Sequence, residues 1–384
     1  MTLDEERALA VRAMFQRIVA RYDLVNRIMT LGLDQRWRAR AAALARPHGG
    51  LALDVGTGTG DLALALLARG ARAVVGVDFA PAMLARAGAK AGRNGALSLA
   101  LADALELPFR EAGDWTRDKL AVLGYYLPGF TTATKRAPER YFVDGLAGSG
   151  VNVIKSSGER VCGSALLALH TRPPFTRCLL LERSPKNVQA LKARTAAFGD
   201  RAIVERGDVN ANLLTLMRRH VNRAAPTLCL LDQEGLDVRW RTVRDLADFR
   251  TRSGKVELLI LFDADGLHRV LSREAGSASE ARLTGFFGGR DWKQVHDEVV
   301  AGNLHGEAAQ TEYVRLYEQK LRHLGYDTTL HRPIRYGGPT GKVMYWLIFA
   351  TTHTAGKEIM DYAFQRAFRS GITFTLPGVP PARP

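Results

Sequence analysis

Cysteine is scarce in this sequence, and the three cysteines are scattered. Cys162, Cys178 and Cys229 form no CxxC pair. An odd, scattered set argues against a disulfide framework or a zinc ribbon, so we expect free or buried thiols. Histidines such as His170 and His296 are equally dispersed, and we predict no metal site.

Long apolar runs are also absent. No stretch approaches the roughly 18–20 apolar residues that a membrane-spanning helix needs. The acidic N-terminus, residues 1–6, lacks the apolar core of a signal peptide. We therefore expect a cytoplasmic protein with no membrane insertion. A chain of 384 residues with 46% hydrophobic and 24% charged residues has room for two globular domains.

Acidic residues are too few to balance the basic ones, and the net charge is +15. Residues 1–111 hold 15 Lys/Arg and 11 Asp/Glu, or +4, so the remaining 39 and 28 leave +11 for the rest. A basic domain attracts polyanions, which makes nucleic acid a possible partner. The alternative is compositional, because 43 of the 54 basic residues are arginine.

Two stretches share one pattern, in which an apolar run ends in an aspartate and a glycine-rich turn. They are residues 51–60, LALDVGTGTG, and residues 141–150, YFVDGLAGSG. This pattern predicts a buried parallel strand that leads into a nucleotide-binding loop. Neither loop has the GxGxxG spacing of dinucleotide folds, so NAD is the weaker interpretation.

The first 111 residues predict an amphipathic helix over 3–29 and strands over 51–55, 74–77 and 97–101. The motifs YDLVN (22–26), GLDQRW (32–37), LDVGTGTGD (53–61), VGVDF (75–79) and ADA (102–104) resemble the ubiquinone/menaquinone biosynthesis C-methyltransferase family (UbiE/MenG). The resemblance implies S-adenosylmethionine (SAM) binding. It implies cofactor contacts from a loop and three acidic residues: Asp54, Gly56, Gly58, Gly60, Asp78 at the ribose and Asp103 near the adenine.

This resemblance ends at about Glu111, where the family continues through further strands. Residues 1–111 therefore read as a truncated half-domain, whose open sheet edge exposes strands that a second half should cover. Quinone-ring C-methylation by this region is one alternative function. A genomic or assembly chimera at the junction is another explanation of the same pattern.

Residues 115–370 predict a complete α/β domain. Helices are expected at 115–127, 161–169 and 184–198, a polar loop at 151–160, parallel strands at 141–143, 178–181, 202–204, 227–231 and 256–262, and a final antiparallel pair at 328–333 and 342–350. The fold class is thus a doubly wound, class I SAM-methyltransferase-like (Rossmann-like) α/β sheet, preceded by a half-domain of the same type. Residues 371–384 are proline-rich and are expected to be disordered.

The second domain resembles the three-Cys-motif partner family (TcmP). The resemblance rests on residues 119–120, FVDGLAGSG (142–150), GSA (163–165), GDVN (207–210), LD (231–232) with GL (235–236), FG (287–288) and YWLIFA (345–350). It implies a methyltransferase-like fold and a three-Cys-motif protein as a possible partner. The family has proline where this chain has Gln233, which affects the loop on the substrate side.

Four acidic residues follow four successive predicted strands of this domain. Asp144 begins the glycine loop with Gly145, Gly148 and Gly150. Glu182 ends the next strand, where a carboxylate can accept hydrogen bonds from ribose hydroxyls. Asp208 follows the third strand, near the expected adenine.

Asp232 follows the fourth strand, at the crevice where such sheets bind ligands. It is the predicted catalytic residue, as a positioning group or as a general base. The sequence therefore predicts SAM-dependent methyl transfer, or SAM binding, mainly by the second domain. The alternative is a non-catalytic partner protein that binds nucleic acid or another protein.

Overall fold

The computed structural model describes residues 14–15, 17–92, 95–101, 109–251, 254–263, 266–267, 277–336 and 340–368. Asp103, which was predicted to contact the adenine of SAM, lies outside the described residues, as does the tail 371–384 that was predicted to be disordered. The chain divides into two compact units. The first comprises residues 1–108 with 189–199, and the second comprises residues 109–188 with 200–384.

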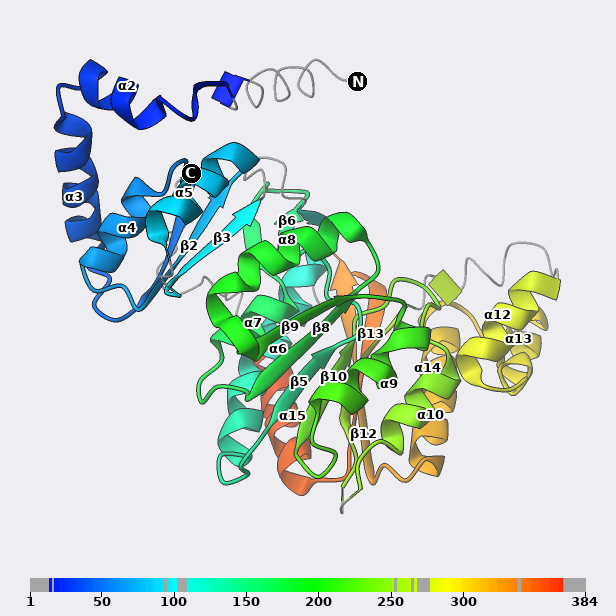
Figure 1. Cartoon of the computed structure of the whole chain (residues 1–384). Coiled ribbons are helices and arrows are strands. Elements are labelled where there is room, and N and C mark those ends of the chain that lie inside the picture. The colour runs from blue at the N-terminus through cyan, green and yellow to red at the C-terminus, as the bar shows by residue number, and fades with distance from the viewer. Residues whose placement is uncertain are drawn as a thin grey trace. The chain divides into compact units, whose positions relative to one another are not determined.

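The first unit contains a small parallel sheet with the strand order β1-β2-β3 (Figure 1). Its strands are β1 (Leu51–Val55), β2 (Ala73–Asp78) and β3 (Leu97–Leu101), which confirms the three strands expected here. Its helices are α2 (Tyr22–Met29), α3 (Leu33–Ala45), α4 (Asp61–Ala68) and α5 (Pro81–Ala91).

Strand β1 is the least covered part of this sheet. Among the described residues it pairs with β2 alone. Leu51, Leu53 and Val55 alternate along one face of β1 and are 40%, 58% and 55% exposed. In doubly wound sheets the first strand is central, with neighbours on both sides. Here the described strands cover only one side of it.

The second unit is built on a seven-stranded sheet with the order β12-β13-β11-β10-β5-β8-β9. Its strands are β5 (Tyr141–Asp144), β8 (Arg177–Glu182), β9 (Ala202–Arg206), β10 (Thr227–Leu231), β11 (Glu257–Phe262), β12 (Thr328–Tyr336) and β13 (Lys342–Thr351). Numbered along the chain from β5, the order is 3-2-1-4-5-7-6. Strand β13 runs opposite to the other six strands, which are all parallel to one another. This is the strand arrangement of class I SAM-dependent methyltransferases, and it confirms the predicted fold.

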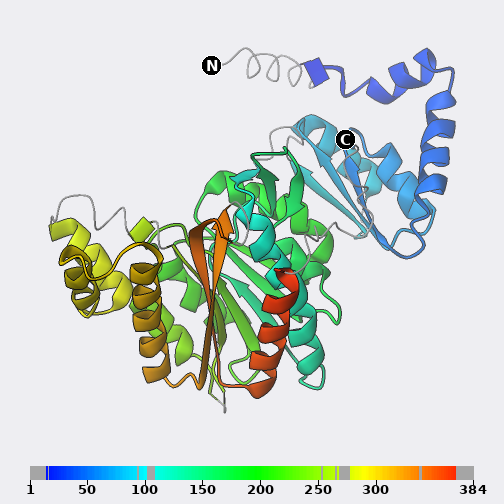
Figure 2. The same ribbon diagram turned by 180° about the vertical axis from the view of Figure 1, so that it is seen from behind.

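The central strands are apolar because both faces of the sheet are covered by helices. Leu228, Leu230 and Leu231 of β10 are completely buried, and each such side chain stabilises the fold by about 1.5–3 kcal/mol. Figures 1 and 2 show helices on both faces, with α6 and α15 on the face that Figure 2 turns to the viewer. The helices are α6 (Trp115–Ala133), α7 (Ser164–His170), α8 (Pro185–Thr195), α9 (Val209–His220), α10 (Trp240–Ala247), α12 (Ser277–Phe287), α13 (Trp292–Val300), α14 (Gly306–His323) and α15 (Thr354–Ala367), with a 3-10 helix at Ala196–Arg201.

Two sequence predictions are wrong in this unit: the helix expected at 161–169 begins only at Ser164, and a strand occupies part of the loop expected at 151–160. Residues 151–160, expected to be a polar loop, form β6 (Val151–Ile154), which pairs antiparallel with β7 (Arg160–Cys162). On its other side β6 pairs in parallel with β4 (Arg110–Ala112). The polar residues were misread because a small, half-exposed sheet has no continuous apolar run. Since β4 belongs to the second unit, Arg110 and Glu111 lie here rather than in the N-terminal region.

Candidate functional site

The predicted acidic residues of the second unit gather at one edge of the large sheet, where parallel strands end. Asp144 and Glu182 are the last residues of β5 and β8. Asp208 follows β9 and caps helix α9, and Asp232 directly follows β10. Carboxyl ends of parallel strands are where doubly wound sheets bind ligands.

A cavity of about 970 Å³ opens at this edge, within the range of small-molecule sites. Among its described lining residues are six carboxylates and four guanidinium groups. The carboxylates are Glu111, Glu182, Asp208, Asp232, Glu234 and Asp237, and the guanidinium groups belong to Arg110, Arg183, Arg239 and Arg282. The excess of carboxylates suits a cationic ligand such as a sulfonium better than a pyrophosphate. We call this space the cofactor cavity.

The glycine loop and Glu182 are joined at one wall of the cofactor cavity. The backbone N–H of Gly148 donates to Glu182 Oε2 at 2.9 Å, and the N–H of Ser184 donates to Oε1 at 2.7 Å. Gly148 has φ +63°, a conformation that residues with a Cβ rarely adopt, so glycine is required at this turn. Gly145 and Gly148 both line the cavity, as expected for a loop whose backbone faces a ligand.

Asp144 and Gly150 do not line the cavities at this edge, and their contacts are internal. Asp144 is fully buried and accepts hydrogen bonds from Ser164 Oγ at 2.6 Å and from the N–H of Leu146 at 3.1 Å. Burial raises the pKa of Asp144 to about 7, against the opposing effect of Ser164. The Gly150 carbonyl accepts from the N–H of Gly163. Both residues shape the loop from behind.

Asp208 lies in the cofactor cavity but already has a structural partner. Its Oδ1 accepts from the N–H groups of Asn210 at 2.9 Å and Ala211 at 3.2 Å, which caps helix α9. The side chain of Asn210 extends this wall by donating to the carbonyl of Asp237 at 2.7 Å. An adenine amino group at this wall would share the Asp208 carboxylate with the helix.

Asp232, the predicted catalytic residue, is 5% exposed and is held by two cations. Lys119 Nζ lies 2.6 Å from Asp232 Oδ2, and Arg110 Nη1 lies 3.5 Å from the same oxygen. Burial alone would raise the pKa of Asp232, but Lys119 and Arg110 outweigh it and hold the pKa below its ordinary value. Asp232 is therefore a carboxylate at neutral pH and a weak base, which favours positioning over proton abstraction.

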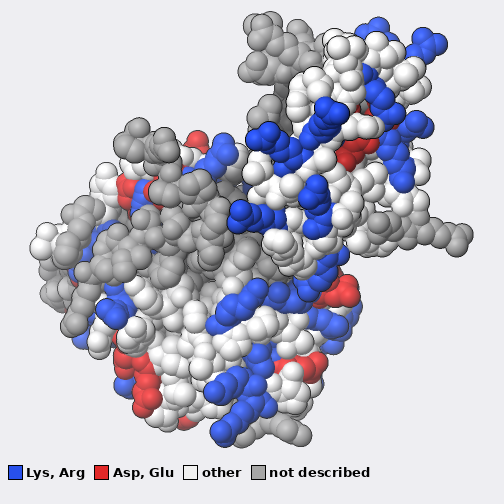
Figure 3. Space-filling model, turned by 90° about the vertical axis from the view of Figure 1, so that its left-hand side faces the viewer, with Lys and Arg blue, Asp and Glu red and all other residues white. Residues whose placement is uncertain are grey.

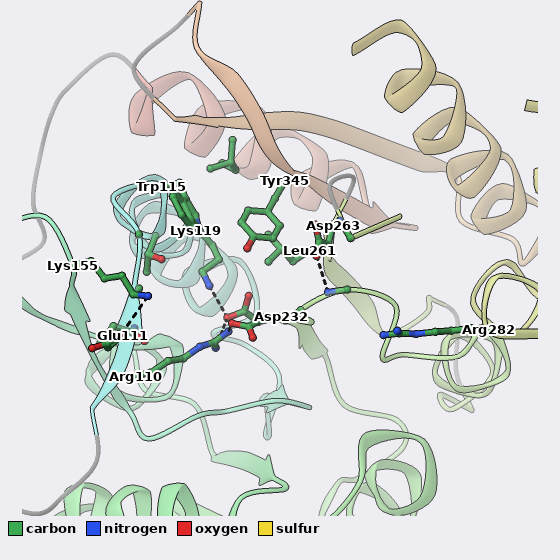
Figure 4. Close-up of a pocket in the computed structure, with 18 of the residues that line it drawn as sticks. Arg110, Glu111, Trp115, Lys119, Lys155, Asp232, Leu261, Asp263, Arg282 and Tyr345 are labelled. Carbon is green, nitrogen blue, oxygen red and sulfur yellow. Dashed lines mark hydrogen bonds and ion pairs between the residues drawn. The ribbon is translucent and has the colours of Figure 1, made fainter. Parts of the chain in front are cut away.

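A second cavity, of about 720 Å³, adjoins the first (Figure 4). The two cavities share lining residues, among them Arg110, Asp232 and Glu234, and these residues mark the junction between the cavities. Figure 4 shows Tyr345 and Trp115 on the side of Asp232 that faces β13 and α6, with Lys119 reaching toward the carboxylate. Leu261 and Ile334 add apolar wall. We call this space the acceptor cavity.

The loop after Asp232 has its own anchors. Gln233 is completely buried, and its Oε1 accepts from the N–H of Val238 at 2.8 Å. The N–H of Gly235 donates to Asp263 Oδ2 at 2.8 Å. Gln233 thus points into the protein and fixes the loop at the position where the resemblance predicts proline.

Sequence reasoning missed several residues of the acceptor cavity. Lys119 had a detectable signal, because it is a lysine on the otherwise apolar, buried face of α6. Tyr345 begins the motif YWLIFA (345–350), but the motif alone assigned it no place in a site. Arg110 had no signal, since it comes from the three-residue strand β4. Burial raises the pKa of Tyr345 to about 12, with added effects from nearby carboxylates such as Asp263, so its hydroxyl is neutral.

The first unit repeats the local geometry of the glycine loop. The N–H of Gly58 donates to Asp78 Oδ2 at 2.7 Å, as Gly148 does to Glu182. Thr57 Oγ1 donates to Asp54 Oδ2 at 2.8 Å. Burial raises the pKa of Asp54, partly offset by Thr57. Gly56, Gly58 and Gly60 have φ of +70°, +55° and +83°.

An ionic cluster supports this loop within the first unit. Asp23 Oδ1 accepts from Thr59 Oγ1 at 2.5 Å, and Lys90 Nζ lies 2.7 Å from Asp23 Oδ2 and 2.6 Å from Asp61 Oδ1. Two motifs that the sequence separates by more than thirty residues, YDLVN and TGTGD, therefore meet at the loop.

The described part of the chain has no helix long and apolar enough to span a bilayer. Within the same residues, no group of three or more His, Cys, Asp or Glu side chains has metal-ligand geometry.

In comparison with known proteins, the N-terminal part of the chain is similar to one family. Residues 1–158 match the ubiE/COQ5 methyltransferase family. The match is less than half of the chain, yet it extends past Glu111 into the second unit. The family match and the strand order together support SAM as the cofactor, as predicted.

Individual relatives agree with this match. A demethylmenaquinone methyltransferase of Deinococcus radiodurans is 44% identical over 111 residues, 28% of this chain and 46% of the relative. One of Thermus thermophilus is 52% identical over 99 residues, 25% of this chain and 45% of the relative. The chain thus spans about half the length of these curated relatives. Among solved structures, the N-terminal domain of human METTL16 in complex with SAH is similar at 10% identity and a TM-score of 0.31, over 58% of this chain and 67% of that one.

Proposed function

We propose that the second unit is a SAM-dependent methyltransferase, with SAM in the cofactor cavity and the methyl acceptor in the acceptor cavity. The observation that carries the proposal is the junction of the two cavities at Asp232. A donor and an acceptor that occupy adjoining cavities meet at one point, and holding them there is the main task of the protein. The bound cofactor supplies a methyl group that its sulfonium already activates.

Each wall residue has a role in this proposal. Gly145 and Gly148 admit the cofactor to the backbone, and Glu182 accepts hydrogen bonds from its ribose hydroxyls. Asp208 and Asn210 form the wall for the adenine. Lys119 and Arg110 keep Asp232 ionised and fixed, so that its carboxylate orients the acceptor.

The test is calorimetric titration of the full chain with SAM. Wild type, Glu182→Ala, Asp232→Ala and Asp78→Ala distinguish the two glycine loops. Loss of binding in Glu182→Ala with unchanged binding in Asp78→Ala supports the second unit as the SAM site. The reverse pattern would move the site to the first unit.

A second candidate function is quinone-ring C-methylation by the N-terminal region. The relatives named demethylmenaquinone methyltransferase support it, together with the shared geometry of the Gly58 and Gly148 loops. The described strands of the first unit cover only one side of β1, which weighs against a complete site there. Purified protein with SAM and a demethylmenaquinone analogue would test this candidate.

Two partner classes remain proposals. The net charge of +15 favours contact with nucleic acid, and on the face that Figure 3 draws, Lys and Arg side chains outnumber Asp and Glu. The resemblance of residues 115–370 to the three-Cys-motif partner family suggests a three-Cys-motif protein as another partner. A non-catalytic role with such a partner would leave SAM binding absent in the calorimetric test.

A further inference from the structure

We infer that the acceptor cavity binds a neutral, planar group that carries an N–H donor, and that this nitrogen receives the methyl group. The inference rests on the proposed methyl transfer and names its acceptor class. Four independent features of the cavity carry it: a carboxylate oxygen without a partner, the absence of a general base, a balance of charges, and two aromatic walls.

The first feature is the free oxygen of Asp232. Lys119 and Arg110 both engage Oδ2, whereas Oδ1 is buried and has no hydrogen-bond partner among the described residues. A buried acceptor without a partner is costly, by about 1–3 kcal/mol. An ionised carboxylate can only accept hydrogen bonds, so the group that satisfies Oδ1 must bring an N–H or O–H.

The second feature is the lack of a general base among the described lining residues. Asp232 is ion-paired and its pKa is lowered. Asp263 accepts hydrogen bonds from the N–H groups of Gly235 and Gly266, Glu234 is paired with Arg110, and Glu111 is paired with Lys155. No described lining residue is a histidine. Hydroxyls and thiols need deprotonation before attack, whereas a neutral nitrogen attacks with its own lone pair.

The third feature is the charge of the acceptor cavity. Its described lining residues carry four cations, Arg110, Lys119, Lys155 and Arg282, and four anions, Glu111, Asp232, Glu234 and Asp263. This balance leaves no net field to hold a charged acceptor. The two cations nearest to Asp232 would repel an ammonium group. A neutral amine is therefore favoured over an alkylammonium.

The fourth feature is the shape of the walls. The rings of Trp115 and Tyr345 lie 6.2 Å apart with an interplanar angle of 47°. Leu261 and Ile334 complete the apolar lining. Aromatic walls favour a flat π-system, which gains contact area with little loss of entropy.

The reaction balances without a further reactant. The methyl group leaves the sulfonium sulfur, which keeps the electron pair of the broken C–S bond. The nitrogen lone pair forms the new N–C bond, and the nitrogen becomes cationic while one N–H still points at Asp232 Oδ1. The proton then passes to water, which leaves a neutral methylated amine.

The test uses the full chain saturated with S-adenosylhomocysteine and four small probes that fit any planar site. Aniline is neutral and has N–H donors, and N,N-dimethylaniline matches it but has none. Benzylamine is a cation, and phenol offers O–H. Saturation-transfer NMR measures binding, and we expect aniline to bind at least ten-fold more tightly than N,N-dimethylaniline and benzylamine. With SAM in place of the product, aniline should be methylated and phenol should not.

Asp232→Asn should reduce the preference for aniline to less than three-fold, because an amide no longer offers a charged acceptor. Asp361→Asn, at a carboxylate of α15 that pairs with Lys357 and lines neither cavity, is the control and should keep the preference. Equal or tighter binding of benzylamine, methylation of phenol alone, or an unchanged preference in Asp232→Asn would overturn the inference. If Asp232→Asn does not fold, the wild-type ranking alone decides. Failure of S-adenosylhomocysteine to bind would instead refute the proposed function.

Discussion

Glu182 gives the sharpest test of where the cofactor binds. Its carboxylate accepts from the N–H groups of Gly148 and Ser184, and Asn187 Nδ2 lies 3.4 Å from Oε1. A carboxylate has about four lone-pair sites, so two short backbone bonds leave capacity for ribose hydroxyls. The side chain is also partly exposed to the cofactor cavity.

Removing this carboxylate should weaken SAM binding by a predictable amount. Hydrogen bonds to a charged group contribute about 1.5–3 kcal/mol, which corresponds to roughly ten- to a hundred-fold in affinity. The loss of SAM affinity in Glu182→Ala should be near the upper end of this range, because the Gly148 N–H also loses its acceptor. Glu182→Gln keeps one carbonyl oxygen as an acceptor, so its loss of SAM affinity should be near the lower end of the range.

Calorimetric titration with SAM measures both variants, and thermal unfolding without ligand shows whether they fold. The matched control is Asp78→Ala in the first unit, where Asp78 binds the Gly58 N–H in the same way. It should leave the affinity unchanged. A Glu182→Ala protein that folds and binds SAM within two-fold of wild type would refute the assignment.

Three further predictions concern stability and charge. Lys119→Met leaves Asp232 buried without its nearest cation and should destabilise the protein by about 3–5 kcal/mol in chemical denaturation. Burial raises the pKa of Glu257 despite hydrogen bonds from Tyr126 and Thr351, so its ionisation destabilises the fold. Stability should therefore fall as the pH rises from the unfolded pKa of Glu257 through its folded pKa, and Glu257→Gln should flatten this part of the curve; a steeper curve would contradict this. Finally, binding of a random oligonucleotide should weaken steeply with salt, and no binding at low salt would make the basic excess purely compositional.

Much of the large sheet could be predicted from the sequence. Strands such as Thr227–Leu231 are continuous apolar runs because helices cover both faces, and this burial produces a signal that needs no partner information. Glycines with positive φ, such as Gly148, mark the turn for the same local reason. Once the strands were placed, the acidic residues at their carboxyl ends could be identified directly, because each one ends its strand or follows it within a few residues.

The acceptor cavity could not be predicted in this way. Arg110 reaches Asp232 from a three-residue strand, and Tyr345 comes from the antiparallel strand β13, more than a hundred residues later. Side chains that meet only through sheet order have no spacing rule in the sequence. For the same reason the sequence could not decide whether Asp232 is a positioning group or a general base. The cations that lower its pKa lie 113 and 122 residues away in the chain.

The two glycine loops show why a local motif does not define a site. Gly58 donates to Asp78 as Gly148 donates to Glu182, and both glycines have a left-handed conformation. The local sequence pattern therefore predicts a cofactor loop equally well in both places. They differ in what lies beyond the first strand. In the second unit β5 lies between β8 and β10, and β10 brings Asp232 to the far wall of the crevice.

In the first unit β1 pairs with β2 alone among the described strands. A ligand crevice in a doubly wound sheet opens where the strand order reverses, and that point requires a strand on each side of the first. Within the described part of the first unit, the loop of residues 56–60 therefore offers backbone N–H groups and a ribose acceptor, and no strand on the other side of β1 forms a wall opposite them. A ligand that contacts half of a binding surface gains about half of the favourable contact free energy. It still loses nearly the same entropy on association as a fully bound ligand, so its net binding free energy falls by more than half. For this reason we propose the second unit as the SAM site, although the curated relatives match the N-terminal part of the chain.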